Sequence, residues 1–369
     1  MSETKNFKLN YAGLGPSLLY GLATGVRNLL YNWDVLHSKE YPIPVICVGN
    51  LAAGGTGKTP HTEYLVQLLK PHYRVAVLSR GYKRQTKGFR LAGANDTART
   101  IGDEPYQMKR KFPDVLIAVD ANRGRGIRHL MELPEEQKPE VVLLDDAFQH
   151  RSVLPSFSIL LTDYHRLYYK DRLLPLGRLR ETKENMRRAN LIIVTKCEAD
   201  LRPIDFRVIA GEMKPLPYQA LYFSRLVYGE TRAVFPQPTE NPTAGNYLNA
   251  ENEALLLAGV ASPQPFIEEA QRRFGNVHPM IFADHHVFDK QDIRKIKDAF
   301  NRLNSPDKFI LVTEKDAARL LHNPFFPEEW KPLTYYLPVA IDFCTKTTLS
   351  FDDCIRKHIL TFQRNNIFH

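Results

Sequence analysis

The sequence predicts an α/β protein with a larger parallel-sheet domain, a smaller α/β domain and an amphipathic helix at its N-terminus. Apolar runs rich in Val and Ile alternate with stretches of helical periodicity, which is typical of a parallel sheet covered by helices. This alternation stops between about residues 202 and 246, where prolines accumulate, and then resumes. Since 369 residues exceed what one hydrophobic core usually serves, we expect two domains.

Residues 1–40 contain a predicted amphipathic, membrane-associating helix that starts at Ser17. Its apolar positions are Leu18, Leu19, Leu22, Val26, Leu29 and Leu30, its amphipathic aromatics are Tyr20, Tyr31 and Trp33, and its cationic flanks are Lys8 and Arg27. No residue from Leu9 to Val26 is charged, but Pro16 and several polar residues argue against a transmembrane helix. The apolar face either lies in a membrane interface or packs on the first domain, and this stretch leaves both open.

The elements of the two domains follow from the same alternation. Residues 41–215 are expected to form the larger domain, with strands at 44–48, 74–78, 115–119, 141–144, 158–161 and 191–194 and a helix at 59–69. Residues 216–250 are interpreted as a linker with a strand or hairpin at 218–227. Residues 251–369 are expected to form the smaller domain, with strands at 254–260, 280–282 and 309–312 and helices at 265–274 and 289–303.

Composition narrows the class of protein. With 43% hydrophobic and 25% charged residues, the chain is neither broadly disordered, nor collagen-like, nor a polytopic membrane protein. A net charge of +9 predicts an anionic partner, and nucleic acid, a phosphorylated substrate or an acidic membrane would each satisfy it. The four cysteines lie far apart and no signal peptide is evident, so we expect no disulfide framework or zinc site and a cytosolic chain.

A glycine-rich loop gives the most specific signal, in Val45-Ile-Cys-Val-Gly-Asn-Leu-Ala-Ala-Gly-Gly-Thr-Gly-Lys-Thr-Pro60. A strand, this loop and a helix form the context of a phosphate-binding P-loop. The expected nucleotide contacts are Ala52, Ala53, Gly54, Gly55, Thr56, Gly57, Lys58 and Thr59. Lys58 would reach the β and γ phosphates, and the Thr59 hydroxyl would bind Mg²⁺. The strict pattern has glycine at the position of Ala52, and a turn that binds nothing is the structural alternative.

Two carboxylates, Asp145 and Asp146, end another apolar strand, where P-loop enzymes place the acid that holds Mg²⁺ or its water shell. A solvated turn or a helix cap at Asp146 is the alternative, and the P-loop favours the metal role. Thr195-Lys196-Cys197-Glu198 also follows a strand and matches the base-reading motif of GTPases only at the lysine. We interpret that segment as an exposed turn at the end of a strand.

Further motifs follow along the chain: Ser79-Arg-Gly-Tyr82, Gly102-Asp-Glu-Pro105, Asp145-Asp-Ala-Phe-Gln-His150, Leu174-Pro-Leu-Gly-Arg-Leu-Arg-Glu181, Asp284-His-His286 and Thr313-Glu-Lys-Asp316. Together with the P-loop they resemble the tetraacyldisaccharide 4′-kinase family, the lipid A 4′-kinases of Gram-negative bacteria. Ala147 replaces a usual glycine, and Leu176 departs from the usual Leu-Pro-Ala-Gly form. The resemblance spans most of the chain.

This resemblance implies a P-loop NTPase-like fold and transfer of the γ-phosphate of ATP, with Mg²⁺, to the 4′ hydroxyl of an acylated glucosamine disaccharide 1-phosphate. It implies a peripheral position on the cytoplasmic side of the inner membrane. Matching the family's motifs, Gln149, His150 and Arg180 are the expected substrate contacts. Arg80 and Arg123 are weaker candidates, because a guanidinium offers paired donors to phosphate but a single arginine is more often a surface residue.

The same resemblance assigns the catalytic residues. Asp103 matches the family's catalytic aspartate and would accept the proton of the sugar hydroxyl, while His285 would orient it and Lys58 would stabilise the transferring phosphoryl group. We expect Asp103 in the first domain and His285 in the second, so that domain closure brings them together. The structural alternatives are a helix cap at Asp103 and a solvated strand end at 284–286.

Two other classes of protein also fit part of the sequence. A nucleotide-dependent switch or metallochaperone-like GTPase would use the same P-loop and acid pair, and its base preference and hydrolysis without lipid would identify it. A nucleic-acid-binding ATPase would explain the net charge, but the basic clusters contain few interleaved aromatics and no recognised binding module, so we expect no nucleic-acid partner.

Overall fold

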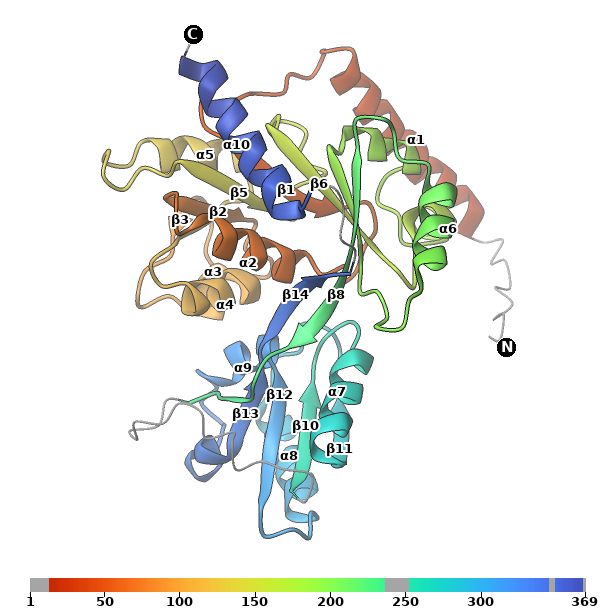
Figure 1. The fold of residues 1–369 in the computed structure, drawn as a ribbon. Coiled ribbons are helices and arrows are strands. Elements are labelled where there is room, and N and C mark those ends of the chain that lie inside the picture. The colour runs from red at the N-terminus through yellow and green to blue at the C-terminus, as the bar shows by residue number, and fades with distance from the viewer. Residues whose placement is uncertain (1–12, 236–251, 345–348, 368–369) are drawn as a thin grey trace. The chain divides into compact units, whose positions relative to one another are not determined.

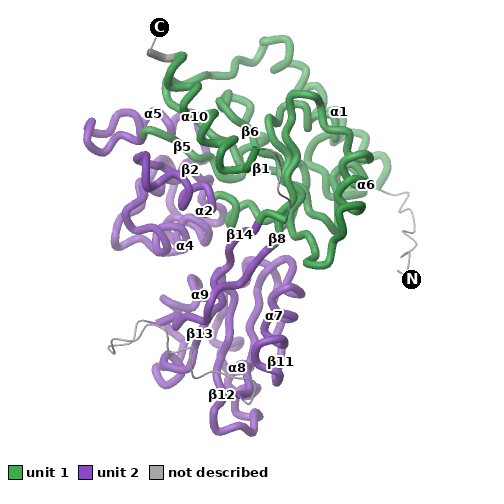
Figure 2. Tube along the Cα trace, in the orientation of Figure 1, with its two compact units in different colours: residues 1–62, 140–225, 343–369 green, residues 63–139, 226–342 purple. Residues whose placement is uncertain are grey.

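The computed structural model describes residues 13–235, 252–344 and 349–367 (Figure 1). Lys8, which was predicted to flank the N-terminal helix, and most of the second half of the predicted 216–250 linker lie outside these residues. The chain divides into two compact units that are interleaved along the sequence (Figure 2). Unit 1 comprises residues 1–62, 140–225 and 343–369, and unit 2 comprises residues 63–139 and 226–342. The domain limits expected from the sequence stay a prediction.

Unit 1 contains a parallel sheet with the strand order β8-β7-β6-β1-β5. The strands are β1(Val45–Asn50), β5(Val141–Asp145), β6(Phe157–Asp163), β7(Leu191–Thr195) and the first part of β8(Ala220–Tyr228). The helices are α1(Leu14–Asn32), the start of α2(Lys58–Leu69), α6(Pro203–Met213) and α10(Phe351–Ile367), with short 3₁₀ turns at Tyr168–Lys170 and Lys183–Arg188. Every residue of β1, β5 and β7 is buried, which explains why these strands read as continuous apolar runs.

Unit 2 contains two groups of strands. In the first, β4(Leu116–Val119) pairs in parallel with β2(Val75–Ser79) and antiparallel with β3(Arg90–Leu91). Its helices are the rest of α2, α3(Ala98–Ile101), α4(Asp103–Lys111) and α5(Arg123–Met131). The second is a five-stranded sheet in the order β11-β10-β12-β13-β9, parallel except for β9.

The strands of the five-stranded sheet are β9(Arg232–Ala233), β10(Glu253–Ala258), β11(Asn276–Ile281), β12(Lys308–Thr313) and β13(Thr334–Leu337), and β14(Val339–Phe343) follows them in the chain. The helices that accompany them are α7(Gln264–Phe274), α8(Lys290–Asn301), α9(Glu314–Leu320) and the 3₁₀ turn Glu328–Leu333. Two apolar clusters form the core of this part of unit 2. One is centred on Ile296, Ile310 and Trp330, and the other on Phe266, Leu256 and Phe309.

The predicted α/β class is confirmed, and most predicted strands lie within one or two residues of their observed bounds. The strand expected at 280–282 starts earlier, at Asn276, because β11 is an edge strand whose exposed Asn276, His278 and Pro279 interrupt the apolar pattern. The strand expected at 254–260 ends at Ala258, and the helix expected to reach residue 303 ends at Asn301, where its C-cap Arg302 follows. These differences lie at element ends, where sequence patterns carry least information.

Helix α1 presents its apolar residues outward. Leu18, Leu19 and Leu22 are 65 to 70% exposed, and Val26 and Leu29 are about half exposed. The buried residues of α1 are polar, Ser17 and Asn28. The interpretation that the apolar face packs on the first domain is therefore wrong for Leu18, Leu19 and Leu22, whose side chains are mostly exposed. Among the residues that the structure describes, no helix is both long and apolar enough to cross a bilayer.

Candidate active site

The P-loop connects β1 to α2 in unit 1. Gly54 and Gly57 have φ angles of +113° and +83°, a region that only glycine enters without strain, and they turn the backbone at the start of α2. Asn50 at the end of β1 donates to the Thr56 hydroxyl at 2.9 Å, and the Thr195 hydroxyl at the end of β7 donates to the Thr56 carbonyl at 2.9 Å. The loop is thus fixed from the ends of two strands, β1 and β7.

The alanines at the start of the loop have a structural role. Ala52 forms an isolated antiparallel bridge with Leu179, and the Ala53 amide donates to the Arg178 carbonyl at 2.6 Å. Ala52 does not have a positive φ, so the backbone requires no glycine there. Alanine at position 52 is therefore compatible with the turn. The backbone contacts of Ala52 and Ala53 attach the loop to the segment that carries Arg180.

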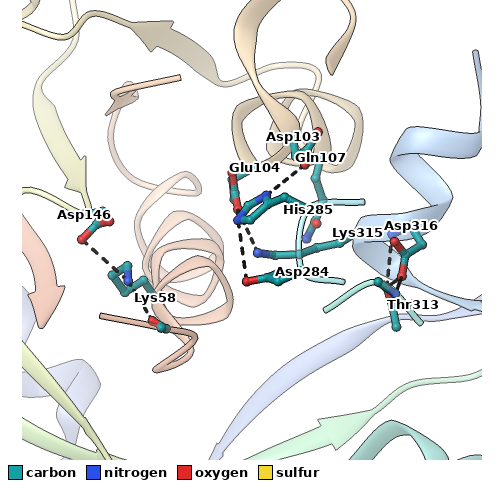
Figure 3. A network of polar contacts seen from close by, with 12 residues as sticks. Lys58, Asp103, Glu104, Gln107, Asp146, Asp284, His285, Thr313, Lys315 and Asp316 are labelled. Carbon is teal, nitrogen blue, oxygen red and sulfur yellow. Dashed lines mark hydrogen bonds and ion pairs between the residues drawn. The ribbon is translucent and has the colours of Figure 1, made fainter. Parts of the chain in front are cut away.

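Three charged side chains of unit 1 meet at the loop. The Lys58 Nζ atom lies 3.7 Å from Asp146 Oδ1, and Arg180 Nη1 lies 3.6 Å from the same oxygen. Figure 3 shows the Lys58 side chain directed toward Asp146. Asp146 has a φ of +48°, so it turns the chain immediately after β5. These ion pairs are long, and an incoming phosphate can replace the carboxylate as the partner of both cations.

The candidate metal ligands are oxygen donors in a mostly buried setting. Asp145 is 4% exposed at the end of β5 and accepts a hydrogen bond from the Thr62 hydroxyl at 3.3 Å, and Thr59 is 6% exposed in the first turn of α2. Within the described part of the chain, no group of three or more His, Cys, Asp or Glu side chains forms a metal cage. Mg²⁺ commonly takes one or two carboxylates together with phosphate oxygens and water, so Thr59, Asp145 and Asp146 fit that ion as ligands of an ATP complex.

The expected substrate residues fall into two groups. In unit 1, Gln149 donates to the Asn50 carbonyl at 2.7 Å, His150 is half-buried in the same turn, and Arg180 reaches Asp146. In unit 2, Arg80 is exposed and lines a hollow of about 430 Å³. Arg123 is 1% exposed and donates to the Asp120 carbonyl at 2.7 Å, so its guanidinium is held beside its own helix start.

Asp103 and His285 lie together in unit 2. His285 Nδ1 is 3.2 Å from Asp103 Oδ2, and Figure 3 shows the imidazole between Asp103 and Glu104 of α4 and Asp284 of its own loop. The expectation that they belong to different domains does not match the contact units, because α4 and α9 pack together within unit 2. Asp103 is the first residue of α4 and Gly102 is the N-cap, so the helix-cap alternative is wrong.

Gly102 allows the start of α4 to lie close against residues 81 and 82. Its φ is +97°, and a Cβ atom at this position would lie 3.1 Å from backbone atoms of Gly81 and Tyr82. The Tyr82 ring in turn contacts the His285 ring edge to face, with centroids 5.4 Å apart. The motifs around residues 79–82, 102–105 and 284–286, which are distant in sequence, therefore form one cluster.

Asp103 also contacts Arg319 of α9, a residue that the sequence analysis did not single out. Arg319 Nε and Nη2 lie 2.9 and 2.8 Å from Asp103 Oδ2. Burial alone would raise the pKa of Asp103, but the hydrogen bond with His285 and the charge of Arg319 outweigh it and hold this pKa below its usual range. The only signal in the sequence was the spacing of three residues between Asp316 and Arg319, which places them on one face of a helix.

A second ionic cluster of unit 2 lies between α2, α4 and α9. Lys111 contacts Glu63 at 2.6 Å and Glu314 at 3.0 Å, and Gln107 donates to Glu63 at 2.7 Å. Burial, followed by the nearby charge of Glu314, raises the pKa of Glu63 to about 7. Lys111 thus pairs with two carboxylates, and folding favours the protonated form of Glu63.

The Thr195-Lys196 segment is more buried than expected. Thr195 is fully buried and Lys196 pairs with Asp163 at 2.7 Å with 10% of its side chain exposed. The interpretation as an exposed turn is wrong for these two residues, because Thr195 donates to the P-loop and Lys196 is fixed by β6. Glu198 is exposed, as expected.

The fold and this site define the chain as a nucleotide-binding P-loop protein of the kinase type. A model of the family described as tetraacyldisaccharide-1-P 4′-kinase matches residues 14–359. The chain belongs to this family, and it is a kinase of lipid A biosynthesis.

Curated relatives agree over nearly the whole chain. The tetraacyldisaccharide 4′-kinase of Parabacteroides distasonis is 54% identical over 350 residues, covering 95% of each chain. That of Bacteroides thetaiotaomicron is 49% identical over 355 residues, covering 95% of this chain and 92% of the relative. The crystal structure of LpxK from Aquifex aeolicus in complex with ATP is 27% identical, with a TM-score of 0.70 over 95% of this chain and 98% of the other. The resemblance inferred from the motifs is confirmed.

Proposed function

We propose that this chain transfers the γ-phosphate of ATP to the 4′ hydroxyl of a tetraacyldisaccharide 1-phosphate, using the P-loop of unit 1 and the Asp103 cluster of unit 2. Family membership supports the reaction. The observation that carries the residue assignment is the contact between Asp103 and His285, which come from motifs 182 residues apart.

At the phosphate end, the P-loop amides and Lys58 bind the triphosphate. Lys58 leaves its long ion pair with Asp146 for the γ-phosphate and stabilises the charge that develops there. Thr59, Asp145 and Asp146 would hold Mg²⁺, which neutralises phosphate charge when bound. Arg180 shares Asp146 with Lys58, so it is placed to take part in the same exchange of partners.

At the acceptor end, Asp103 receives the proton of the sugar hydroxyl, and His285 orients the carboxylate. Because its pKa is held low, Asp103 is a carboxylate at neutral pH and ready to accept a hydrogen bond from the hydroxyl. Gln149, His150 and Arg180 contact the disaccharide substrate, and Arg80 and Arg123 are weaker candidates for such contacts.

The outer face of α1 attaches the enzyme to the membrane surface at which an acylated substrate resides, on the cytoplasmic side of the inner membrane. Polar contacts hold α1 on unit 1: Ser17 donates to the Leu173 carbonyl at 3.2 Å and Tyr20 to the Arg180 carbonyl at 3.0 Å. This leaves Leu18, Leu19 and Leu22 free to enter a lipid interface. The contact of Tyr20 also joins the membrane helix to the segment that carries Arg180.

The reaction is tested by incubating the purified protein with ATP labelled at the γ position and a lipid A disaccharide 1-phosphate in detergent micelles. We expect Mg²⁺-dependent transfer of label to the 4′ position of the lipid. Hydrolysis of ATP or GTP that does not depend on lipid, with no labelled lipid, would instead support the nucleotide-switch class.

The membrane role is tested with Leu22→Glu combined with Leu29→Glu. We expect the variant to stop sedimenting with anionic lipid vesicles, while its melting temperature and its activity on a short-chain soluble acceptor remain. Leu360→Glu, at a residue of α10 that is 50% exposed, serves as the matched control and should sediment like the wild type. A fall in melting temperature without loss of vesicle binding would contradict the membrane assignment.

A further inference from the structure

We propose that Arg319 is the positioning residue of the acid-base pair, fixing Asp103 so that one carboxylate oxygen is anchored and the other faces the acceptor hydroxyl. This inference rests on the proposed catalytic role of Asp103. Arg319 lies in α9, far in sequence from Asp103, and its side chain is 5% exposed. Its buried guanidinium is therefore a fixed part of unit 2.

The contacts of Arg319 use every edge of the guanidinium. Nε donates to Asp103 Oδ2 at 2.9 Å, and Nη2 forms an ion pair with the same oxygen at 2.8 Å. Nη1 donates to the Gly259 carbonyl at 2.8 Å and to Asp316 Oδ1 at 2.7 Å. A planar fork held at both ends cannot rotate, so it fixes the carboxylate that it binds.

The other end of the fork is anchored to the five-stranded sheet. Asp316 is fully buried, and its second oxygen accepts from the Gly259 amide at 2.8 Å and from the Thr313 hydroxyl at 2.6 Å (Figure 3 shows the Thr313 contact). Gly259 follows β10 and Thr313 ends β12, so two neighbouring strands hold Asp316 in place. A chain of short contacts thus runs from the sheet through Asp316 and Arg319 to Asp103.

The contacts to Asp103 are unequal between its oxygens. The donors described above all reach Oδ2, with the two bonds from Arg319 shorter than the 3.2 Å contact of His285. Oδ1 is consequently the oxygen that the sugar hydroxyl would meet. An aspartate held at one oxygen by a hydrogen bond and an ion pair to one buried guanidinium keeps its orientation when the substrate arrives, which is what a proton acceptor in a positioned site requires.

Arg319 also constrains His285. Its Nη2 atom lies 3.3 Å from His285 Nδ1, and that nitrogen is 3.2 Å from Asp103 Oδ2. A guanidinium only donates and a carboxylate only accepts, so His285 Nδ1 can form a hydrogen bond with one of them at a time. The position of the imidazole proton is thereby tied to the presence of Arg319.

Other charged groups face this pair. Glu104 of α4 and Asp284 lie 3.9 and 4.0 Å from His285 Nε2, and Lys315 of α9 pairs with Glu104 at 2.8 Å. The positive charge of Lys315 pairs with Glu104, and that of Arg319 pairs with both Asp103 and Asp316. Removing Arg319 leaves Asp103 without a cation of its own, and the burial that opposes its charge then raises its pKa.

The test compares Arg319→Gln, Arg319→Lys and Asp103→Ala in the lipid kinase assay across pH. For Arg319→Gln we expect kcat to fall by roughly 10- to 100-fold with unchanged KM for ATP, the range for partners that orient a functional group. The acid limb of the kcat profile should move to higher pH, because a higher pKa for Asp103 means protonation at higher pH. Arg319→Lys keeps the charge and loses the fork, so its acid limb should stay near that of the wild type while kcat is intermediate.

The matched control is Arg273→Gln. Arg273 also binds a carboxylate, Glu269, and two backbone carbonyls, those of Tyr228 and Gly229, but in α7 and without contact to Asp103 or His285. It should change melting temperature only. In the Asp103→Ala background, Arg319→Gln should cost little further activity, since the two residues act as one unit.

The outcomes separate the two proposals. Near-normal kcat in folded Asp103→Ala would overturn the catalytic assignment itself. A large loss in Asp103→Ala with normal kcat and an unmoved acid limb in Arg319→Gln would overturn only the positioning role. If Arg319→Gln does not fold, Arg319→Lys decides the question, because wild-type kcat in that variant would show that the fork is dispensable.

Discussion

In unit 1 the Lys58 and Arg180 cations share one oxygen of Asp146 at 3.7 and 3.6 Å, whereas in unit 2 one oxygen of Asp103 receives the Arg319 guanidinium at 2.8 and 2.9 Å. The first arrangement is loose and about a third exposed at Asp146 and Arg180. The second is tight and anchored to the sheet through a fully buried Asp316.

The difference agrees with the roles proposed for the two regions. Cations that have to receive a triphosphate keep weak partners, because a strong internal ion pair would compete with the ligand. A proton acceptor has to keep its orientation before and after the ligand binds, so it is held by short bonds. Under these proposals, the same residue types would bind phosphate in one region and position the proton acceptor in the other.

The largest effect is expected from substitutions in the P-loop of unit 1. Lys58→Ala should lower turnover by ~10³-fold or more, because the transferring phosphoryl group loses its principal cation. Thr59→Ala should also lower turnover by orders of magnitude through loss of a Mg²⁺ ligand. Single-turnover transfer of labelled phosphate measures both, and near-normal rates in folded variants would reject the P-loop assignment. Lys70→Ala, which removes a surface ion pair to Asp114, is the control.

The next largest loss of activity is expected from substitutions of Asp103 and His285 in unit 2. Asp103→Ala and His285→Ala should each reduce kcat by about 10²- to 10³-fold with little change in ATP affinity. The double variant should be much less damaging than the product of the single losses, because the two residues are in direct contact. Multiplicative losses, or a loss confined to ATP binding, would contradict the pair.

A smaller effect is expected from the acids that follow β5. Asp145→Asn and Asp146→Asn should shift the Mg²⁺ titration of activity to higher concentrations, Asp145 through loss of a buried ligand and Asp146 through a changed partner for Lys58 as well. An activity curve against Mg²⁺ that is unchanged in both variants would reduce the two acids to a turn.

The smallest effects are expected in the pH dependence of stability, from two buried residues of α2. His61, just after the P-loop, donates from Nδ1 to the Gly57 carbonyl at 2.7 Å, and its Nε2 atom accepts from the Ser224 hydroxyl at 3.0 Å. Burial lowers the pKa of His61 from 6.5 to about 4. As the pH falls, His61 is protonated in the unfolded chain before it is protonated in the folded protein. The stability that the neutral His61 contributes is therefore complete above pH 6.5 and is lost as the pH falls toward 4. Glu63, whose pKa is raised from 4.5 to about 7, acts in the opposite sense: its contribution is complete below pH 4.5 and is lost as the pH rises through 7.

Urea unfolding at pH values from 4.5 to 8 measures this contrast. His61→Gln should remove a rise in stability between about pH 4 and 6.5, and Glu63→Gln should remove a fall in stability between about pH 4.5 and 7. Identical pH dependence in both variants and the wild type would show that neither group is linked to folding.

Much of this protein was determined by local sequence. The P-loop is a contiguous motif whose glycines, lysine and threonine have fixed spacing, and buried parallel strands such as β1 and β5 appear as unbroken apolar runs. The family could be recognised for the same reason, since its motifs are short contiguous segments in a constant order. The role of Asp103 came from that resemblance, because one aspartate before a helix has no distinguishing local pattern.

Tertiary structure decided what depends on contacts between distant segments. Arg319 meets Asp103 across 216 residues, and neither residue carries a sign of the other in its local sequence. The orientation of α1 was equally hidden, since an amphipathic pattern gives two faces but not which one is buried, and hydrogen bonds from Ser17 and Tyr20 turned the polar face inward. Periodicity reports which side chains share a face, whereas the partner of that face depends on free energies of packing and hydrogen bonding that only the folded chain sets.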